Sequence, residues 1–135
     1  MKKLATLLIL LTIAIAVNAE ITVYKTNAVA EQWGENYKWD EWSDWDSTEV
    51  MITLNIDNLT VAMDNNDDDK FYIISTYEEL KTETNHNGKY TSMIFLAKDK
   101  EDIKCYITFI KYSEDNVQIY VAYSNYRFVY QCERI

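Results

Sequence analysis

The sequence predicts an all-β protein: an antiparallel meander of about eight strands that forms a small barrel or a strongly rolled sheet. Three observations support this prediction. Short runs of alternating apolar and polar residues follow one another along the chain, separated by turn signals. The connections between these runs are too short for the crossover helices that parallel strands require. Proline, which paired strands exclude, is absent, and only Gly34 and Gly88 occur.

The clearest part of the pattern is the stretch 103–134, which predicts three strands joined by tight turns at 113–116 and 124–125. A four-residue first turn pairs Tyr112 with Val117, and a two-residue second turn pairs Tyr123 with Tyr126. Because side chains alternate along a strand, this register creates one nearly apolar face, which we expect to face the core. That face consists of Tyr106, Thr108, Ile110, Tyr112, Val117, Ile119, Val121, Tyr123, Tyr126, Phe128, Tyr130 and Cys132.

Cys105 and Cys132 are the two cysteines of the chain. The same register puts them on opposite faces, about seven residues apart along the middle strand, which is beyond the reach of a disulfide. A β-bulge would change this phase, so a bridge stays open as an alternative. The favoured interpretation is two small buried side chains. Tyr120, Val129 and other apolar residues on the second face indicate that part of it is covered too.

Upstream of the meander, alternation predicts strands at 20–31, 48–56, 59–63, 70–76 and 89–97. Asp57 and Asn58 form a turn dipeptide between two of these strands. The stretch 77–86 is ambiguous between helix and strand. Asn87-Gly88 is the strongest hairpin signal in the chain, and it favours a long, twisted strand that turns there and pairs with 89–97.

The start of the chain has the pattern of a secretory signal peptide. Two lysines precede an uncharged apolar run from Leu4 to Val17, and Ala19 ends a short cleavage-site motif. The run is shorter than the ~20 residues that span a bilayer. We therefore expect cleavage after Ala19, a signal peptide at 1–19 and a single all-β domain at 20–135. The mature protein would be secreted or periplasmic, with no membrane insertion after cleavage.

The charge of the chain excludes several classes of partner. Removal of the signal peptide would remove Lys2 and Lys3, which leaves 11 of the 13 basic residues and all 22 acidic residues. The net charge of the mature chain would be about −11. Nucleic acids and anionic membranes require clustered lysine and arginine, so neither is an expected partner. With two glycines, neither a dinucleotide-binding motif nor a P-loop can be written, and we expect no cofactor.

All four tryptophans, Trp33, Trp39, Trp42 and Trp45, fall within thirteen residues, with acidic residues between them. A spacing of three fits neither face of a sheet, so it indicates an irregular loop or one turn of helix that lays the indoles across a barrel end. Two interpretations stay open: a binding surface for a glycan or a protein, and a plug that packs the barrel end. The spacing predicts that Trp39 is buried and that Trp45 is partly exposed.

Two further groups are weak candidates. An acidic loop carries Asp64, Asp67, Asp68 and Asp69 and has oxygens enough for calcium, but the glycine and the final glutamate of an EF-hand are missing, which favours a solvated hairpin loop. His86 is the single histidine and lies beside the hairpin signal, a poor place for a catalytic triad. We therefore assign no catalytic residues and no metal site, and expect a protein that is not an enzyme.

The strand number, the size and the signal peptide together resemble a lipocalin-type or calycin-type barrel. The G-x-W signature of that family is absent, because Trp33 precedes Gly34. The resemblance implies that Arg127 covers a tryptophan, as the arginine of that family does. It also implies a binding module, with an apolar small molecule in the barrel or a glycan or protein at the tryptophan-rich end. The alternative is an interaction or structural protein with a filled core.

Overall fold

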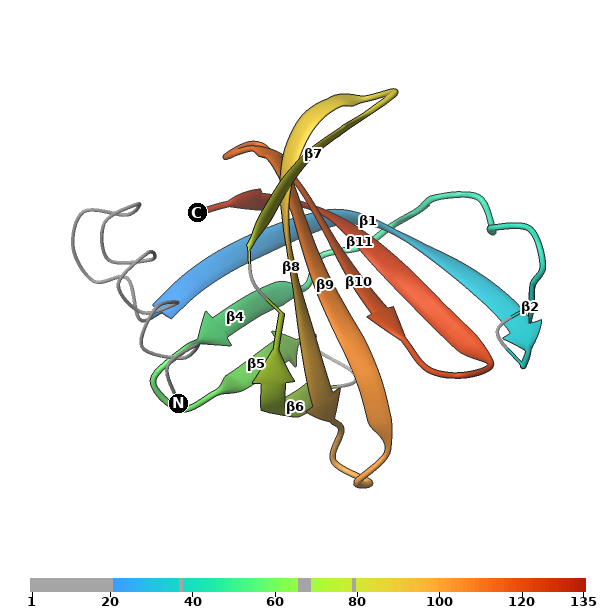
Figure 1. Cartoon of the computed structure of the whole chain (residues 1–135), viewed down its shortest axis with the longest axis vertical. Coiled ribbons are helices and arrows are strands. Elements are labelled where there is room, and N and C mark those ends of the chain that lie inside the picture. Colours follow the sequence, from blue (N-terminus) through green and yellow to red (C-terminus); the bar gives the residue numbers. More distant parts are fainter. Residues whose placement is uncertain (1–20, 37, 66–68, 79) are drawn as a thin grey trace.

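The computed structural model describes residues 21–36, 38–65, 69–78 and 80–135, and this part of the chain is all β-structure (Figure 1). Its strands are β1 (Ile21–Glu35), β2 (Lys38–Trp39), β3 (Asp46–Ser47), β4 (Met51–Asn55), β5 (Thr60–Asp64), β6 (Lys70–Tyr77), β7 (Lys81–Asn85), β8 (Gly88–Lys98), β9 (Lys104–Ser113), β10 (Asn116–Ala122) and β11 (Tyr126–Arg134). The expected signal peptide lies outside the described residues. Within them, no helix has the length and apolarity needed to cross a membrane.

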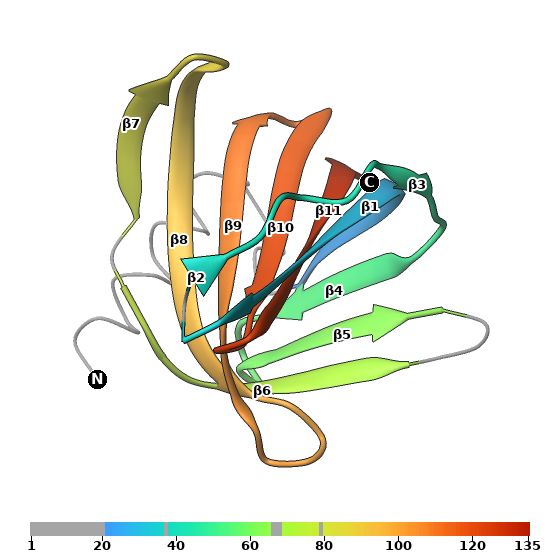
Figure 2. The ribbon, with the colours of Figure 1, turned by 90° about the vertical axis from the view of Figure 1, so that its right-hand side faces the viewer.

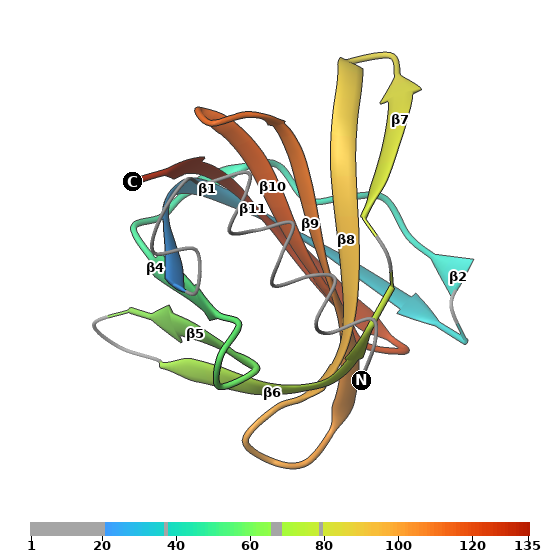
Figure 3. The same ribbon diagram turned by 60° about the vertical axis from the view of Figure 1, so that its left-hand side comes forward.

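Eight of the strands form a closed antiparallel barrel in the order β1-β4-β5-β6-β8-β9-β10-β11, with β11 pairing back to β1. The predicted fold class is therefore confirmed. β2 and β3 pair with β1 outside this ring, and β7 pairs with β8 alone. Because β6 pairs directly with β8, the β7–β8 hairpin projects beyond the barrel (Figures 2 and 3).

The first and last strands close the barrel. Their pairing runs from Tyr24 opposite Arg134 to Trp33 opposite Tyr126, with a β-bulge between Thr26 and Ala28. Thr26 is fully buried, and it holds the bulge through two hydrogen bonds to Val50: its N–H donates to the Val50 carbonyl (3.0 Å), and its Oγ1 accepts from the Val50 N–H (2.8 Å). A bulge bends a strand. The bend lets the long β1 leave β4 and continue along β11.

The interior of the barrel is filled by alternate apolar residues, as the periodicity of the sequence predicts. On β4 and β5 the expected set is buried, with Leu59 only partly so. The fully or nearly fully buried interior residues include Val50, Ile52, Leu54, Ile56, Val61, Met63, Tyr72, Ile74, Phe95, Ala97, Ile107, Ile119, Val121, Phe128 and Cys132. Each Å² of apolar surface removed from water stabilises the folded state by about 25 cal/mol, so this cluster is the main source of the protein's stability.

The predicted face is right for β10 and β11 but wrong for β9. Ile107 and Phe109 are buried, whereas Tyr106 is 49% exposed. The cause is the turn after β9: Ser113 pairs with Asn116, but Val117 pairs with Lys111, so the register skips Tyr112. This irregularity shifts the phase of β9 by one residue and turns every side chain on it to the other face.

The same shift corrects the placement of the cysteines. Cys105 and Cys132 both face the interior rather than opposite faces, and both are free and buried, as the favoured interpretation expects. Cys132 pairs with Val117 at the start of β10, whereas Cys105 precedes Tyr106, which pairs with Ala122 at the end of β10. The two thiols therefore lie near opposite ends of the barrel, and burial raises the pKa of each to about 12.

Two turns differ in detail from the prediction. At the hairpin tip Asn85 pairs with Gly88, so the turn residues are His86 and Asn87. Gly88 opens β8 at a φ of 116°, a conformation that side chains disfavour, which explains a glycine here. Between β4 and β5 the turn extends past Asn58 to Leu59, which has a φ of 54°.

The β8–β9 turn is organised by one carboxylate. Asp99 accepts hydrogen bonds from the N–H groups of Glu101 (2.9 Å) and Ile103 (3.0 Å) and from the Tyr123 hydroxyl (2.9 Å). Burial alone would raise the pKa of Asp99, but these hydrogen bonds outweigh it and lower the pKa below its usual value. The turn is thereby tied to the loop between β10 and β11.

We expect Asp99→Ala to lower the free energy of unfolding by about 1.5–3 kcal/mol at neutral pH, because three donors lose a charged acceptor. A carboxylate with a lowered pKa contributes stability above its unfolded pKa, and this contribution is lost as the pH falls through its folded pKa. Urea denaturation should therefore show a larger difference between wild type and Asp99→Ala at neutral pH than at a pH well below the usual carboxyl pKa of about 4. Glu101→Ala is the matched control, since its exposed side chain makes no hydrogen bond to a described residue. A difference independent of pH would contradict this assignment.

Candidate functional site

The tryptophan-rich stretch after β1 lies along the outer wall of the barrel, not across its end. We call residues 38–47 the tryptophan segment. It folds back on the free edge of β1, where the N–H of Asp40 donates to the Trp33 carbonyl and that of Ser43 to the Glu31 carbonyl, both at 2.8 Å. Figure 2 shows it crossing in front of β10 and β11. It contains the short strands β2 and β3 and no helix. The expected position across a barrel end is wrong, because the segment pairs with the edge of β1 along the outer wall.

Gly34 makes this return possible. A Cβ atom at this position would lie 2.4 Å from the Lys38 carbonyl oxygen and 2.9 Å from the Trp39 ring. Both distances are too short for any side chain. The glycine therefore allows β2 to pack directly against the end of β1.

Arg127 anchors the tryptophan segment to the barrel. It lies on the outer face of β11, and its guanidinium carbon is 4.4 Å from the centroid of the Trp39 ring and 5.1 Å from that of Trp42. Its Nε donates to Gln32 Oε1 (2.6 Å), and Gln32 in turn donates to the Asp40 carbonyl. The expected cover of a tryptophan by Arg127 is thus present, through stacking of the kind that favours arginine over lysine.

The segment covers part of the outer face but buries none of the four indoles. Trp33 is 58% exposed, Trp45 50% and Trp42 37%, while Trp39 is half-buried. The prediction for Trp45 is right, and that for Trp39 is wrong, because Arg127 covers only one face of its ring. A barrel plug is therefore excluded. Val129, beneath the segment, is buried as the apolar residues of this face indicate.

The structure brings Trp39 and Trp42 together over Arg127 and places Trp33 elsewhere. Trp33 pairs opposite Tyr126 on the other face of the sheet, and the two rings stack with centroids 4.2 Å apart. The remaining candidates are dispersed. Asp64 and Asp69 are exposed, and Asp67 and Asp68 lie outside the described residues. No group of three metal-ligating side chains occurs in the part of the chain that the structure describes.

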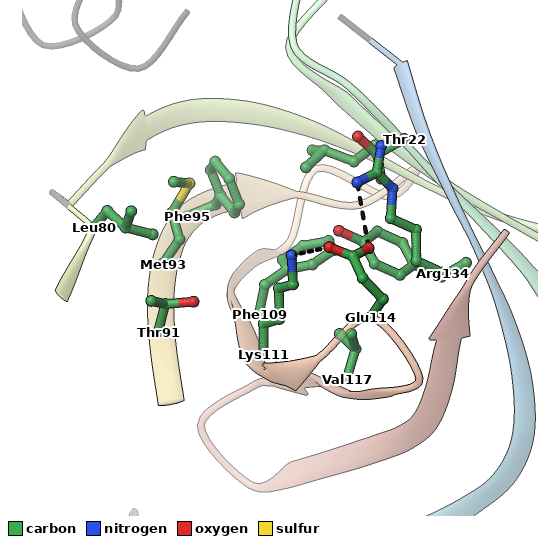
Figure 4. A pocket seen from close by; sticks show the side chains of 12 residues that line it. Thr22, Leu80, Thr91, Met93, Phe95, Phe109, Lys111, Glu114, Val117 and Arg134 are labelled. Atoms are coloured by element: carbon green, nitrogen blue, oxygen red, sulfur yellow. Dashed lines mark hydrogen bonds and ion pairs between the residues drawn. The ribbon is translucent and has the colours of Figure 1, made fainter. Parts of the chain in front are cut away.

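A site that sequence reasoning missed lies at one end of the barrel. Here the interior opens into a cavity of about 280 Å³ (Figure 4). Its walls come from β1, β4, β8, β9, β10 and β11 and from the linker before β7. The lining residues are Thr22, Tyr24, Leu54, Leu80, Thr91, Met93, Phe95, Phe109, Lys111, Glu114, Val117 and Arg134.

The course of β8 explains this cavity. The end of β8, from Phe95 to Lys98, pairs with β6. The start of β8, from Gly88 to Ser92, pairs instead with β7, which lies outside the ring. The barrel wall is therefore incomplete beside Met93 and Leu80. Phe109 packs edge-on against Phe95 (centroids 5.7 Å apart) and contacts Tyr24 (5.6 Å), so aromatic rings separate the cavity from the filled interior.

The cavity has a charged mouth. Glu114 lies between Lys111 and Arg134, accepting a hydrogen bond from Lys111 and one of 3.3 Å from Arg134 (Figure 4). The hydrogen bond from Lys111, aided by the Arg134 charge, lowers the pKa of Glu114. Burial raises the pKa of Tyr24 to about 12, so its hydroxyl is neutral at pH 7. Two cations and one carboxylate leave a net positive charge here, in a chain of net charge −9.

The register error on β9 hid this site from sequence reasoning. With the predicted phase, Phe109 and Lys111 point outward. With the observed phase they point inward, where Lys111 meets Glu114. The signal in the sequence was the turn Ser113–Asn116, which fits a two-residue turn with a bulge as well as a four-residue loop.

Comparison of the chain with protein-family models, with curated proteins and with solved structures gives no match. The structure shows an eight-stranded antiparallel closed barrel, and the resemblance to lipocalin-type proteins stays a prediction.

We expect Trp39→Ala to cost about 1–2 kcal/mol of unfolding free energy, because it removes the ring stacked on Arg127. Trp45→Ala, with a half-exposed ring, should change stability by no more than about 0.5 kcal/mol. Urea denaturation of the two variants provides the comparison. Equal losses would show that Arg127 does not anchor the segment.

Proposed function

We propose that this protein binds a small, largely apolar molecule that carries an anionic group, held in the cavity at the open end of the barrel. The observation that carries the proposal is the combination of apolar walls with a positively charged mouth. Ligand sites are typically concave and apolar, with a few polar groups that fix the orientation of the ligand. Lys111, Glu114 and Arg134 are such groups.

The size of the cavity limits the ligand. An enclosed apolar cavity of about 150 Å³ accommodates benzene. The space here, about 280 Å³, is nearly twice that and is open to solvent. It therefore suits two fused rings, with a linked third ring extending into the opening, or a short acyl chain, with the polar end of the ligand at the mouth.

The charges at the mouth favour an anion. Arg134 is 25% exposed and Lys111 43%, so both cations stay within reach of a bound molecule. In the free protein, Glu114 partly neutralises them. A ligand carboxylate or sulfonate would compete with Glu114 for these donors, and a charge-assisted hydrogen bond is about twice as strong as a neutral one.

The rival function, an interaction or structural protein with a filled core, is supported by the dense packing around Ile52, Phe95 and Ile119. The cavity favours the binding function, because empty apolar space lowers stability unless something occupies it. We propose binding without catalysis, with Lys111, Glu114 and Tyr24 as groups that orient the ligand. From the pattern of residues 1–19, we place this function in a secreted or periplasmic protein.

The contribution of charge can be tested with two probes of similar shape, anilinonaphthalene sulfonate, which is anionic, and phenylnaphthylamine, which is neutral. We expect both to bind saturably in a fluorescence titration. Arg134→Met should lower the affinity for the anionic probe by about tenfold, which corresponds to ~1.4 kcal/mol of binding free energy. It should change the affinity for the neutral probe by less than about twofold. Glu114→Gln should strengthen the anionic probe, because a competing carboxylate is lost. Equal effects on both probes would remove the anionic group from the proposal.

The location of the ligand can be tested by filling the cavity. Met93 lines it, so Met93→Trp should abolish saturable binding of the neutral probe, at a stability cost of about 1–3 kcal/mol from overpacking. Met51→Trp is the matched control, since Met51 is 39% exposed on the outer wall. Unchanged binding to a folded Met93→Trp variant would place the ligand outside the barrel and favour the filled-core rival.

A further inference from the structure

A second concave surface lies on the outside of the barrel. It is a groove of about 360 Å³ between the tryptophan segment on one side and the tip of the β7–β8 hairpin on the other. Ala30, Ile110 and Val129 form an apolar floor, and Ala30 and Val129 are buried. The groove shares no lining residue with the cavity at the barrel end.

The groove is neutral, although the protein is strongly acidic. Its twelve lining residues are Ala30, Trp42, Ser43, Trp45, Asn85, His86, Asn87, Ile110, Tyr112, Gln118, Tyr120 and Val129, with no aspartate, glutamate, lysine or arginine among them. In a chain that is 26% charged, twelve residues taken at random would include about three charged side chains. A neutral groove gives an ionic partner no complementary charge, so the composition favours an uncharged ligand.

The polar groups of the groove are held in place by hydrogen bonds among themselves. Asn85 Nδ2 donates to the Tyr112 hydroxyl (2.8 Å), which fixes the hairpin tip against β9. Tyr120 donates to Gln118 Oε1 (3.1 Å), and Gln118 Nε2 donates to Gln131 (3.2 Å). Amides and hydroxyls in a fixed arrangement are suited to the alternating donors and acceptors of sugar hydroxyl groups, and ordering them in advance lowers the entropy cost of binding.

Two indoles supply an apolar platform beside these polar groups. Trp42 is held edge-on against Tyr120, at a centroid distance of 6.1 Å, and its ring also lies over Arg127. Trp45 is 50% exposed, and no described residue is stacked on its ring. An indole face offers a large, rigid apolar area on which the C–H face of a pyranose ring packs, while its N–H is a single donor at the rim.

From this juxtaposition we infer that the groove between the tryptophan segment and the β7–β8 hairpin is a binding site for a neutral glycan. Trp45 is the stacking platform, and Tyr112, Gln118 and the amides of the hairpin tip are the hydroxyl-binding groups. A protein partner is less well matched, because the site is a walled groove rather than an open, flat patch with a polar rim. This site is independent of the barrel-end cavity, and either one functions without the other.

The test is isothermal titration calorimetry of the purified protein with four neutral oligosaccharides: cellohexaose, xylohexaose, mannohexaose and N-acetylchitohexaose. We expect at least one of them to bind. Trp45→Ala should weaken it by about tenfold or more, as loss of a central aromatic contact does. Tyr112→Phe, which removes one hydroxyl and keeps the ring, should weaken it less.

Trp33→Ala is the matched control, because Trp33 is equally accessible, at 58% exposed, but lies outside the groove. The affinity of the Trp33→Ala variant for the sugar should stay within about twofold of the wild-type affinity. Thermal melting of each variant separates loss of binding from loss of folding. Absence of binding to all four sugars by the folded wild type, or equal losses in Trp45→Ala and Trp33→Ala, would overturn the inference. Saturable binding of a peptide in the groove, with no binding of any of the four sugars, would overturn it in favour of a protein partner.

Discussion

The pairing of the first strand with the last is the constraint on which the rest of the structure depends. β11 follows β1 from Tyr24 to Trp33, and this ladder converts an open sheet of eight strands into a ring. Closure matters because an open edge exposes unpaired backbone groups to other chains. It also brings Arg134 opposite Tyr24 and Arg127 opposite Gln32, so one pairing positions part of the cavity wall and the anchor of the tryptophan segment.

The length of β1 has a second effect, on its other edge. β4 pairs with it only as far as Lys25, so the remaining two thirds of the strand would be unpaired on that side. The chain itself covers this edge: β3, Ser43, Asp40 and β2 pair with successive parts of β1. The indoles are carried along by this backbone pairing and come to lie on the outer wall. Their accessibility is thus a result of how an edge is protected, and it leaves one wall of a groove beside the hairpin.

The fold was predictable from the sequence because closure and alternation depend on patterns that extend over many residues. The buried residues of β4, β5 and β10 follow the period of two, and those of β11 depart from it at Val129, which lies beneath the tryptophan segment. The site was not predictable, because it depends on single residues where that period breaks. One skipped residue, Tyr112, turns Phe109 and Lys111 inward. Similarly, nothing in the spacing of the tryptophans specifies whether they cover an end or a wall, since that choice depends on Arg127, about ninety residues after Trp39 in the sequence.

The burial of the two thiols has a consequence for the chemistry of the protein. The thiolate, and not the thiol, attacks disulfides and peroxides, so a raised pKa keeps Cys105 and Cys132 unreactive at neutral pH. They also lie too far apart to join each other, so the folded chain resists both oxidation and disulfide exchange in an oxidising compartment. The sulfur atoms become reactive only when the barrel opens. Cys132 lies in the ladder that closes the ring, opposite Thr26, so the rate at which a thiol reagent modifies it in the native protein is a measure of how often β1 and β11 come apart.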